Sequence, residues 1–136
     1  MQQLPNTENA LVLRTDFTND AAWEQICANI QAPIGEFQAY VNFLDNSQYD
    51  GVTTEQLPTL GALEINYSFM FIVDKLAVLH PENPILVVNL SILPIQSFRA
   101  IPSTMWGIEN NLSTANMDFE EFVNTVDHDG IFRGFS

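Results

Sequence analysis

The stretch YSFMFIVDKLAVLHPENPILVVNL, residues 67–90, sets the architecture of this chain. Two continuous runs of β-branched, aromatic and aliphatic residues lie at its ends, within NYSFMFIVD (66–74) and ILVVNLS (85–91). Runs without polar alternation are typical of strands buried on both faces, so we expect two central strands. The turn HPENP carries two prolines and favours antiparallel pairing of the strands around it. The segment DKLAVLH fits either a helical turn or a strand extension.

Strand and helix signals alternate in the first third of the chain. ALVLRT (10–15) predicts a strand, and DAAWEQICANIQ has apolar residues at helical spacing behind a cap at Asn19 or Asp20. FQAYVNFLD (37–45) alternates apolar and polar residues and predicts a half-buried strand. Alternation of this kind favours crossover connections and parallel pairing.

Five shorter elements complete the pattern. TTEQLPTL (53–60) has the spacing of a capping box, and its proline predicts a short or bent helix. SFRAI (97–101) predicts a short strand. Apolar spacing predicts helices over 102–112 and 118–126, and IFRGF (131–135) predicts a strand or a docked tail.

The element order is therefore roughly β-α-β-α-β-β-β-α-α. It predicts an α/β (α+β) fold, with one mixed β-sheet of about five strands and helices packed on it. At 136 residues the chain has the length of one domain. We expect residues 1–9, which are polar, to form a flexible leader, and residues 10–136 to form a single compact domain.

Charge is the most unusual feature of the composition. Seventeen acidic residues face four Lys and Arg, which gives a net charge of −13. A chain of this kind cannot build the basic surface that neutralises phosphates, so we expect no nucleic-acid binding. Binding to an anionic membrane surface is disfavoured for the same reason. The favoured interpretation of the acidity is high solubility alone. The alternatives are a basic protein partner and cation binding.

The sequence also favours a cytoplasmic location. Its first ten residues, MQQLPNTENA, have neither the positive nor the apolar region of a signal peptide. No apolar run reaches the roughly 18 residues that a membrane-spanning helix needs. Cys27 is the one cysteine, so an internal disulfide is excluded.

No cofactor, metal site or catalytic residue is predicted. The two histidines, His80 and His128, have no metal-ligand spacing, and DHDG lacks the remaining ligands of a calcium loop. Phosphate-binding glycine motifs and nucleophile elbows are absent. Asp16 and Asp74 each end a predicted strand, and the sequence leaves open whether they meet as a carboxylate pair.

The three arginines are informative because basic residues are so few. Arg14 and Arg99 lie in predicted strands, and Arg133 lies among apolar residues near the end of the chain. A buried charge requires a partner, so we expect each to pair with a carboxylate such as Asp16 or Glu109. The alternative is a pocket in which the arginines bind an anion.

Three asparagines lie in MWGIENNLSTANMDFEEF, where the apolar spacing predicts core-facing helices. The favoured interpretation is structural, because amide side chains can satisfy the backbone of a loop between two helices. The alternative is a recognition patch anchored by Trp106.

These segments resemble a family of small bacterial proteins of unknown function. The similarity rests on RTDF…AAW, on W-x-I-E-N-N-L-S-x-A-N-M-D-F-E-E-F and on D-x-D-G-I-F-R-G-F, and it covers nearly the whole chain after about residue 10. The family has no assigned activity, so the resemblance implies a shared fold and no mechanism. It implies that nine residues belong to one pattern and are candidate ligand or partner residues: Arg14, Asp16, Trp106, Glu109, Asn110, Asn111, Asn116, Asp118 and Arg133.

Two functional hypotheses follow. The first is a non-enzymatic, acidic protein-interaction domain, such as an inhibitor or immunity-type partner of a basic effector. The second is a small enzyme or ligand-binding domain whose polar pocket lies near Trp106 and the asparagines. A homodimer formed through a sheet edge is compatible with either hypothesis.

Overall fold

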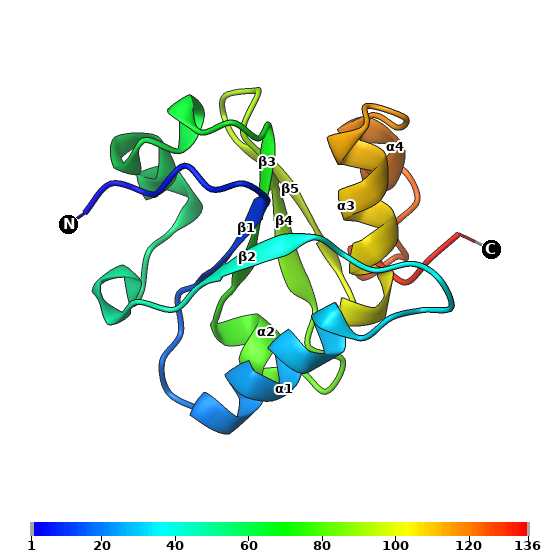
Figure 1. Ribbon diagram of the computed structural model, residues 1–136, viewed down its shortest axis with the longest axis horizontal. Coiled ribbons are helices and arrows are strands. Elements are labelled where there is room, and N and C mark those ends of the chain that lie inside the picture. The colour runs from blue at the N-terminus through cyan, green and yellow to red at the C-terminus, as the bar shows by residue number, and fades with distance from the viewer. Residues whose placement is uncertain (1, 136) are drawn as a thin grey trace.

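The two long apolar runs form neighbouring antiparallel strands in the middle of the sheet. A computed structural model describes residues 2–135 (Figure 1). In it, β3 (Phe69–Val73) pairs with β4 (Ile85–Asn89), and all five residues of β3 are buried. The two predicted central strands are therefore confirmed.

The sheet has six strands in the order β2-β1-β3-β4-β5-β6. β1 pairs in parallel with both β2 and β3, and β5 pairs in parallel with β6, whereas β3–β4 and β4–β5 are antiparallel. The remaining strand bounds are β1 (Ala10–Arg14), β2 (Val41–Leu44), β5 (Gln96–Ala100) and β6 (Ile131–Phe132). The predicted class, a mixed sheet with helices packed on it, is confirmed, and the short tail strand β6 brings the strand number to six.

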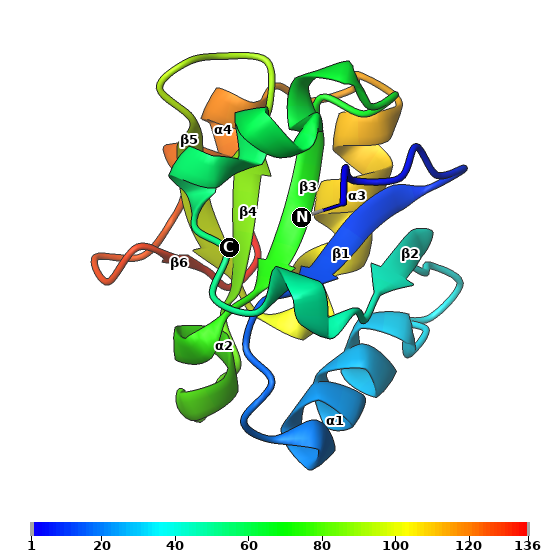
Figure 2. The same ribbon diagram turned by 90° about the vertical axis from the view of Figure 1, so that its left-hand side faces the viewer.

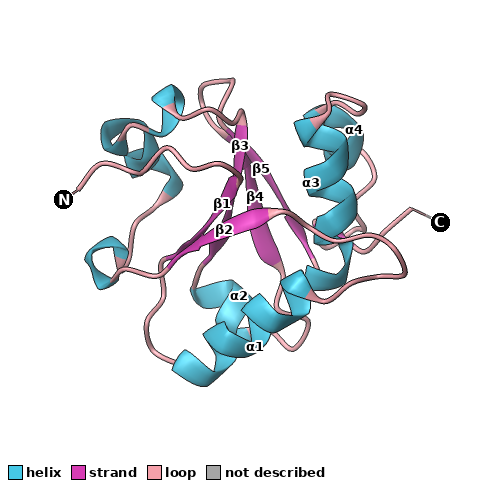
Figure 3. Cartoon of the chain, in the orientation of Figure 1, coloured by secondary structure: helices cyan, strands magenta, loops and turns pink. Residues whose placement is uncertain are grey.

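Helices follow the strands at the expected places (Figure 3). Their bounds are α1 (Asp20–Gln31), α2 (Lys75–Leu79), α3 (Met105–Ser113) and α4 (Phe119–Val123). Asn19 caps α1, because its side chain accepts a hydrogen bond from the amide of Ala22 at 3.0 Å. The ambiguous segment after β3 is helical, because Asp74 caps α2 through the amide of Ala77 at 3.1 Å.

The two faces of the sheet have different covers (Figure 1). α1, α3 and α4 pack on one face, against alternate strand residues such as Val12 and Phe71. The opposite face, which contains Leu13 and Ile72, is covered by short 3-10 helices. These 3-10 helices are η1 (Ser47–Tyr49), η2 (Thr54–Leu60) and η3 (Ala62–Glu64), and a fourth, η4 (Pro102–Thr104), leads into α3. The helix predicted over 53–60 is thus a 3-10 helix that contains its proline.

The segment predicted as a flexible leader contacts the face that carries the 3-10 helices. Leu4 is 7% exposed, and its amide donates to the carbonyl of Leu60 at 2.8 Å. The hydroxyl of Tyr49 donates to the carbonyl of Gln2 at 2.9 Å. These contacts add the side chain of Leu4 to the apolar cluster on that face. Met1, which belongs to the predicted leader, lies outside the described residues.

The strand predicted over 37–45 is wrong in its first part. β2 begins only at Val41, and the side chains of Phe37 and Tyr40 are 51% and 61% exposed. Backbone groups of Gln38 and Tyr40 bond to side chains of α3 instead of to a strand. These long-range contacts, which apolar alternation cannot reveal, occupy the segment 37–40, and the strand begins only after it.

Candidate functional site

One face of α3 holds the loop that leads into β2. The Trp106 ring stacks on Phe37, with 4.6 Å between ring centroids and 17° between planes. One turn later, Glu109 Oε1 accepts a hydrogen bond from the amide of Tyr40 at 2.8 Å. Asn110 Nδ2 donates to the carbonyl of Gln38 at 3.2 Å. Residues 106, 109 and 110, which make the three contacts, are at helical spacing and lie on one face of α3. Three candidate residues therefore converge on the segment 37–40.

Glu109 is a buried carboxylate that is satisfied by neutral donors. Glu109 as a whole is 6% exposed. Besides the Tyr40 amide, it accepts from Asn110 Nδ2 at 2.9 Å and from Ser113 Oγ at 2.6 Å. The expectation that Glu109 pairs with an arginine is wrong, because α3 and the segment 37–40 supply its donors instead.

The other two candidate amides close the C-terminal end of α3. Asn111 Nδ2 donates to the carbonyl of Gly107 at 2.7 Å, and Asn116 Nδ2 donates to Asn111 Oδ1 at 2.8 Å. The carbonyl of Asn111 also accepts from the amides of Asn116 and Met117, at 2.9 and 3.2 Å. The bonds to the carbonyl of Asn111 satisfy one of the groups that a helix end leaves without partners.

Asp118 differs from the cap that its sequence position predicts. It occupies the N-cap position of α4 in an extended conformation, but its side chain makes no capping hydrogen bond. The side chain is exposed and lines a hollow of about 600 Å³ together with Leu112, Met117 and Glu120.

Arg14 is buried at the carboxyl edge of the parallel strands. It is 3% exposed, and its Nη2 and Nη1 atoms bond to Asp20 at 2.6 Å and to Asp45 at 3.2 Å. Its Nε donates to the backbone carbonyl of Asp16 at 3.1 Å, and its guanidinium carbon lies 4.4 Å from the centroid of the Phe17 ring. The expected ion pair with the Asp16 carboxylate is therefore wrong.

Sequence reasoning missed both carboxylates that pair with Arg14. Asp20 opens the helix after β1, and Asp45 directly follows β2, so the parallel pairing of β1 with β2 brings both to the same edge. Had the parallel register been known, the acid directly after β2 would have indicated Asp45; Asp20 had no such signal, because Asp16 is the acid nearest to the end of β1.

Asp16 and Asp74 lie on the same edge of the sheet but have different partners. The parallel neighbours β1 and β3 end together, since the amide of Thr15 donates to the carbonyl of Val73 at 3.0 Å. The Asp16 carboxylate accepts from the amide and hydroxyl of Thr18 at 3.2 and 3.1 Å. Asp74 receives Arg99 in a two-point contact of 2.9 and 2.7 Å. Each carboxylate thus has its own local hydrogen-bond donors.

Arg133 gathers three carboxylates near the end of the chain. Its guanidinium bonds to Glu82 at 2.8 Å, to Asp127 at 2.7 Å and to Asp129 at 2.7 Å. The hydrogen bond from Arg133 lowers the pKa of Asp129 from 3.8 to about 2, and it lowers the pKa of Glu82 as well. The three negative charges around Arg133 therefore exceed its single positive charge.

We expect the titration of Asp129 to depend on Arg133. Its pKa is depressed in the folded state, so its contribution to stability is present above about pH 4 and is lost as the pH falls through about 2. NMR titration of the carboxyl carbons should give a midpoint near 2, and Arg133→Gln should move it toward 3.8. Asp118, which makes no ion pair with an arginine within residues 2–135, is the reference carboxylate. An unchanged midpoint in the variant would contradict the assigned cause.

The single cysteine lies on α1 in a partly buried position. Burial raises the pKa of the Cys27 thiol from 9.0 to about 12. Because the thiolate is the reactive form, we expect a disulfide reagent at pH 8 to label the native protein up to about a thousandfold more slowly than the urea-unfolded protein. Equal rates in the two states, measured by absorbance, would show that the thiol is not protected.

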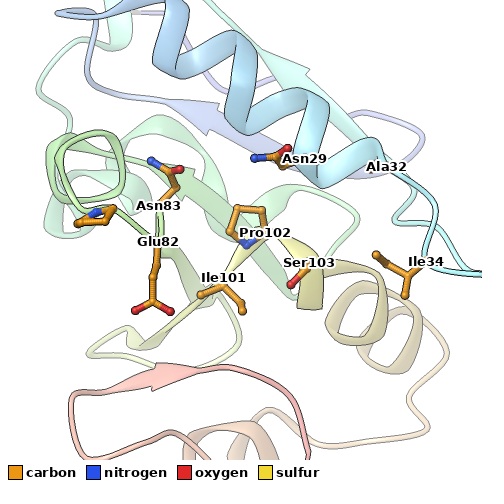
Figure 4. A pocket seen from close by; sticks show the side chains of 9 residues that line it. Asn29, Ala32, Ile34, Glu82, Asn83, Ile101, Pro102 and Ser103 are labelled. Carbon is orange, nitrogen blue, oxygen red and sulfur yellow. The ribbon is translucent and has the colours of Figure 1, made fainter.

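The pocket hypothesis places a cavity near Trp106 and the asparagines. Five hollows of about 260 to 600 Å³ lie on the described part of the chain, and none of these five is lined by Trp106, Asn110, Asn111 or Asn116. One of them, of about 380 Å³, lies between the end of α1, the turn at Asn83 and the segment at Pro102 (Figure 4).

Within residues 2–135, no three His, Cys, Asp or Glu side chains are placed to hold a metal ion. Among the same residues, no helix is both long and apolar enough to cross a membrane.

The fold and these contacts define an acidic, single-domain α+β protein whose arginines are engaged by carboxylates. Residues 9–135 match the family described as a domain of unknown function, DUF6924, and the chain belongs to that family. No curated protein matches the sequence. The match agrees with the resemblance to a family that has no assigned function.

Proposed function

We propose that this chain is a non-enzymatic, cytoplasmic protein-interaction domain that binds a basic partner, as an inhibitor or immunity-type protein binds its effector. One observation carries the proposal. Arg14, Arg99 and Arg133, three of the four basic residues, are each bonded to at least one carboxylate. A partner that approaches the net charge of −13 therefore meets little competing positive charge.

Such a charge distribution acts mainly on the rate of association. Complementary fields raise the association rate of proteins far above the value for neutral surfaces, and salt screens the effect within about 10 Å at 0.1 M. An inhibitor of a damaging effector benefits from fast capture. The exposed carboxylates of Glu24, Glu55 and Glu64, which lie on three different elements, spread the negative field over the surface.

The ligand-pocket hypothesis has weaker support from the same contacts. Trp106 packs on Phe37, and the asparagine side chains bond to backbone groups and to one another. Side chains used in this way are not free to converge on a small molecule. Self-association also has an electrostatic cost, because each copy carries −13.

The test is affinity capture followed by reconstitution. Proteins retained from native lysate at low salt are identified, purified and measured against the chain by stopped-flow fluorescence at 50 to 500 mM NaCl. We expect a basic partner whose association rate falls at least about tenfold over this range. Glu24→Gln combined with Glu64→Gln should slow association, and Gln25→Asn is the matched neutral control. A partner of neutral charge, or a rate that is independent of salt, would overturn the proposal.

A further inference from the structure

We propose that the open edge of β2, with Phe37 and Tyr40 beside it, binds an extended segment of the basic partner as an additional strand. This inference rests on the proposed function and names its binding surface. The recognition mode is strand addition, in which backbone hydrogen bonds supply affinity and side chains supply specificity. The surface is called the β2 edge below and consists of Phe37, Tyr40 and residues 41–44.

β2 is the outermost strand and has one neighbour. In the described part of the chain it pairs with β1 alone, and it lies at the margin of the sheet in Figure 2. In a parallel pair, alternate residues direct their backbone N–H and C=O groups away from the neighbour, so β2 presents unpaired groups along its outer side. The opposite edge of the sheet offers fewer backbone groups for pairing, because β6 has two residues. It runs directly into Arg133, which is bonded to carboxylates.

The β2 edge lacks the features that usually protect an edge strand. Val41–Leu44 reads VNFL, with no proline and no charged residue, and all four residues are half-buried. Natural proteins commonly place lysine, proline or a bulge on such an edge to prevent pairing. Directly before the strand, Phe37 and Tyr40 are 51% and 61% exposed, and exposed aromatic residues are frequent anchors of interfaces.

α3 keeps the β2 edge in a fixed position. Glu109 binds the amide of Tyr40, Asn110 binds the carbonyl of Gln38, and Trp106 supports the ring of Phe37. A segment fixed in this way loses little conformational entropy when a partner binds, which raises affinity. The contacts that interrupt the predicted strand at 37–40 therefore present two aromatic side chains next to the edge.

Charge selects a basic segment over a second copy of this chain. Exposed carboxylates flank the β2 edge, with Glu36 before it and Asp45, whose side chain is 49% exposed, directly after it. Arg14, bonded to Asp45, has a side chain that is only 4% exposed. A strand rich in lysine or arginine complements this border, whereas a second copy would bring like charge.

The test uses defined peptides on the full chain. An eight-residue peptide of alternating lysine and valine is titrated into ¹⁵N-labelled protein, and backbone shifts and hydrogen exchange are followed. We expect shifts at residues 40–44. We expect slowed exchange at those of residues 41–44 whose N–H groups face outward, because the amide of Tyr40 already bonds to Glu109. The same peptide with N-methyl groups on alternate residues, and a peptide of alternating glutamate and valine, should each bind at least about tenfold more weakly.

Matched variants locate the contact. Tyr40→Lys places a positive charge at the β2 edge, and its backbone amide can still bond to Glu109, so we expect the lysine–valine peptide to bind about tenfold more weakly. Leu79→Lys makes the same charge change on α2, at a side chain that is 67% exposed, and should leave binding nearly unchanged.

Three outcomes would overturn the inference. Shifts spread over distant carboxylates, without protection at residues 41–44, would mean that the peptide binds by charge alone. The proposed function would then stand, and the assignment of the β2 edge would not. Concentration-dependent dimerisation that Tyr40→Lys abolishes would assign the β2 edge to a second copy. Absence of any peptide binding would also reject the inference, whereas the proposed function is judged separately by the salt dependence of the purified partner.

Discussion

Replacing Glu109 with alanine is expected to lower the free energy of unfolding by about 2–4 kcal/mol. The change removes the acceptor for three donors: the amide of Tyr40, the side-chain amide of Asn110 and the hydroxyl of Ser113. These groups lie in a partly buried region, where donors without partners are costly. Urea denaturation followed by circular dichroism measures the loss.

Two controls make the prediction about Glu109 specific. Glu109→Gln keeps one oxygen acceptor and should cost about 1 kcal/mol, whereas Glu24→Ala, at an exposed position on α1, should change stability by less than about 0.5 kcal/mol. Hydrogen exchange at Tyr40 should accelerate in Glu109→Ala before global unfolding. If the alanine and glutamine variants were equally stable, the three hydrogen bonds would not be the source of the effect.

Arg14→Met is expected to destabilise the protein by about 2–3 kcal/mol. Methionine keeps much of the side-chain length but leaves the backbone carbonyl of Asp16 without its donor. It also removes the attraction of the guanidinium for the carboxylates of Asp20 and Asp45. Contact of the guanidinium with the Phe17 ring adds to the loss. The cost stays below that of a fully buried pair because the Asp20 side chain is 81% exposed and is hydrated after the change.

Lys75→Met is the matched control for Arg14→Met. Both variants lose one positive charge, but Lys75 is exposed at the start of α2 and makes no ion pair within residues 2–135. Thermal unfolding should therefore move by several degrees for Arg14→Met and by little for Lys75→Met. Similar shifts for both variants would indicate that net charge, rather than the contacts of Arg14, governs the change.

The central strands and the fold class could be predicted because their signals are local. β3 and β4 are continuous apolar runs that must be covered on both faces, and the cap at Asn19 lies within a few residues of α1. β2 shows where local signals fail. The alternation that begins at Phe37 is typical of a strand, yet Glu109, which lies 69 residues beyond Tyr40, binds the amide of Tyr40.

The candidate residues were harder to interpret than the strands. That the arginines would find carboxylates follows from the cost of burying charge, and each arginine does. Which carboxylate each one binds depends on strand register and on which edges meet, and neither is visible in the residues alone. For the same reason, Asp45 was missed although it directly follows a predicted apolar run.

The unequal covers of the sheet imply unequal resistance to opening. One face lies under regular helices, whereas the other lies under short 3-10 helices, to which residues 2–4 are joined by hydrogen bonds at Tyr49 and Leu60. Short turns contribute few hydrogen bonds of their own, so local unfolding should start there and leave α3 and the strand edge that it supports intact. A partner could then remain bound to the β2 edge while the face under the 3-10 helices unfolds locally.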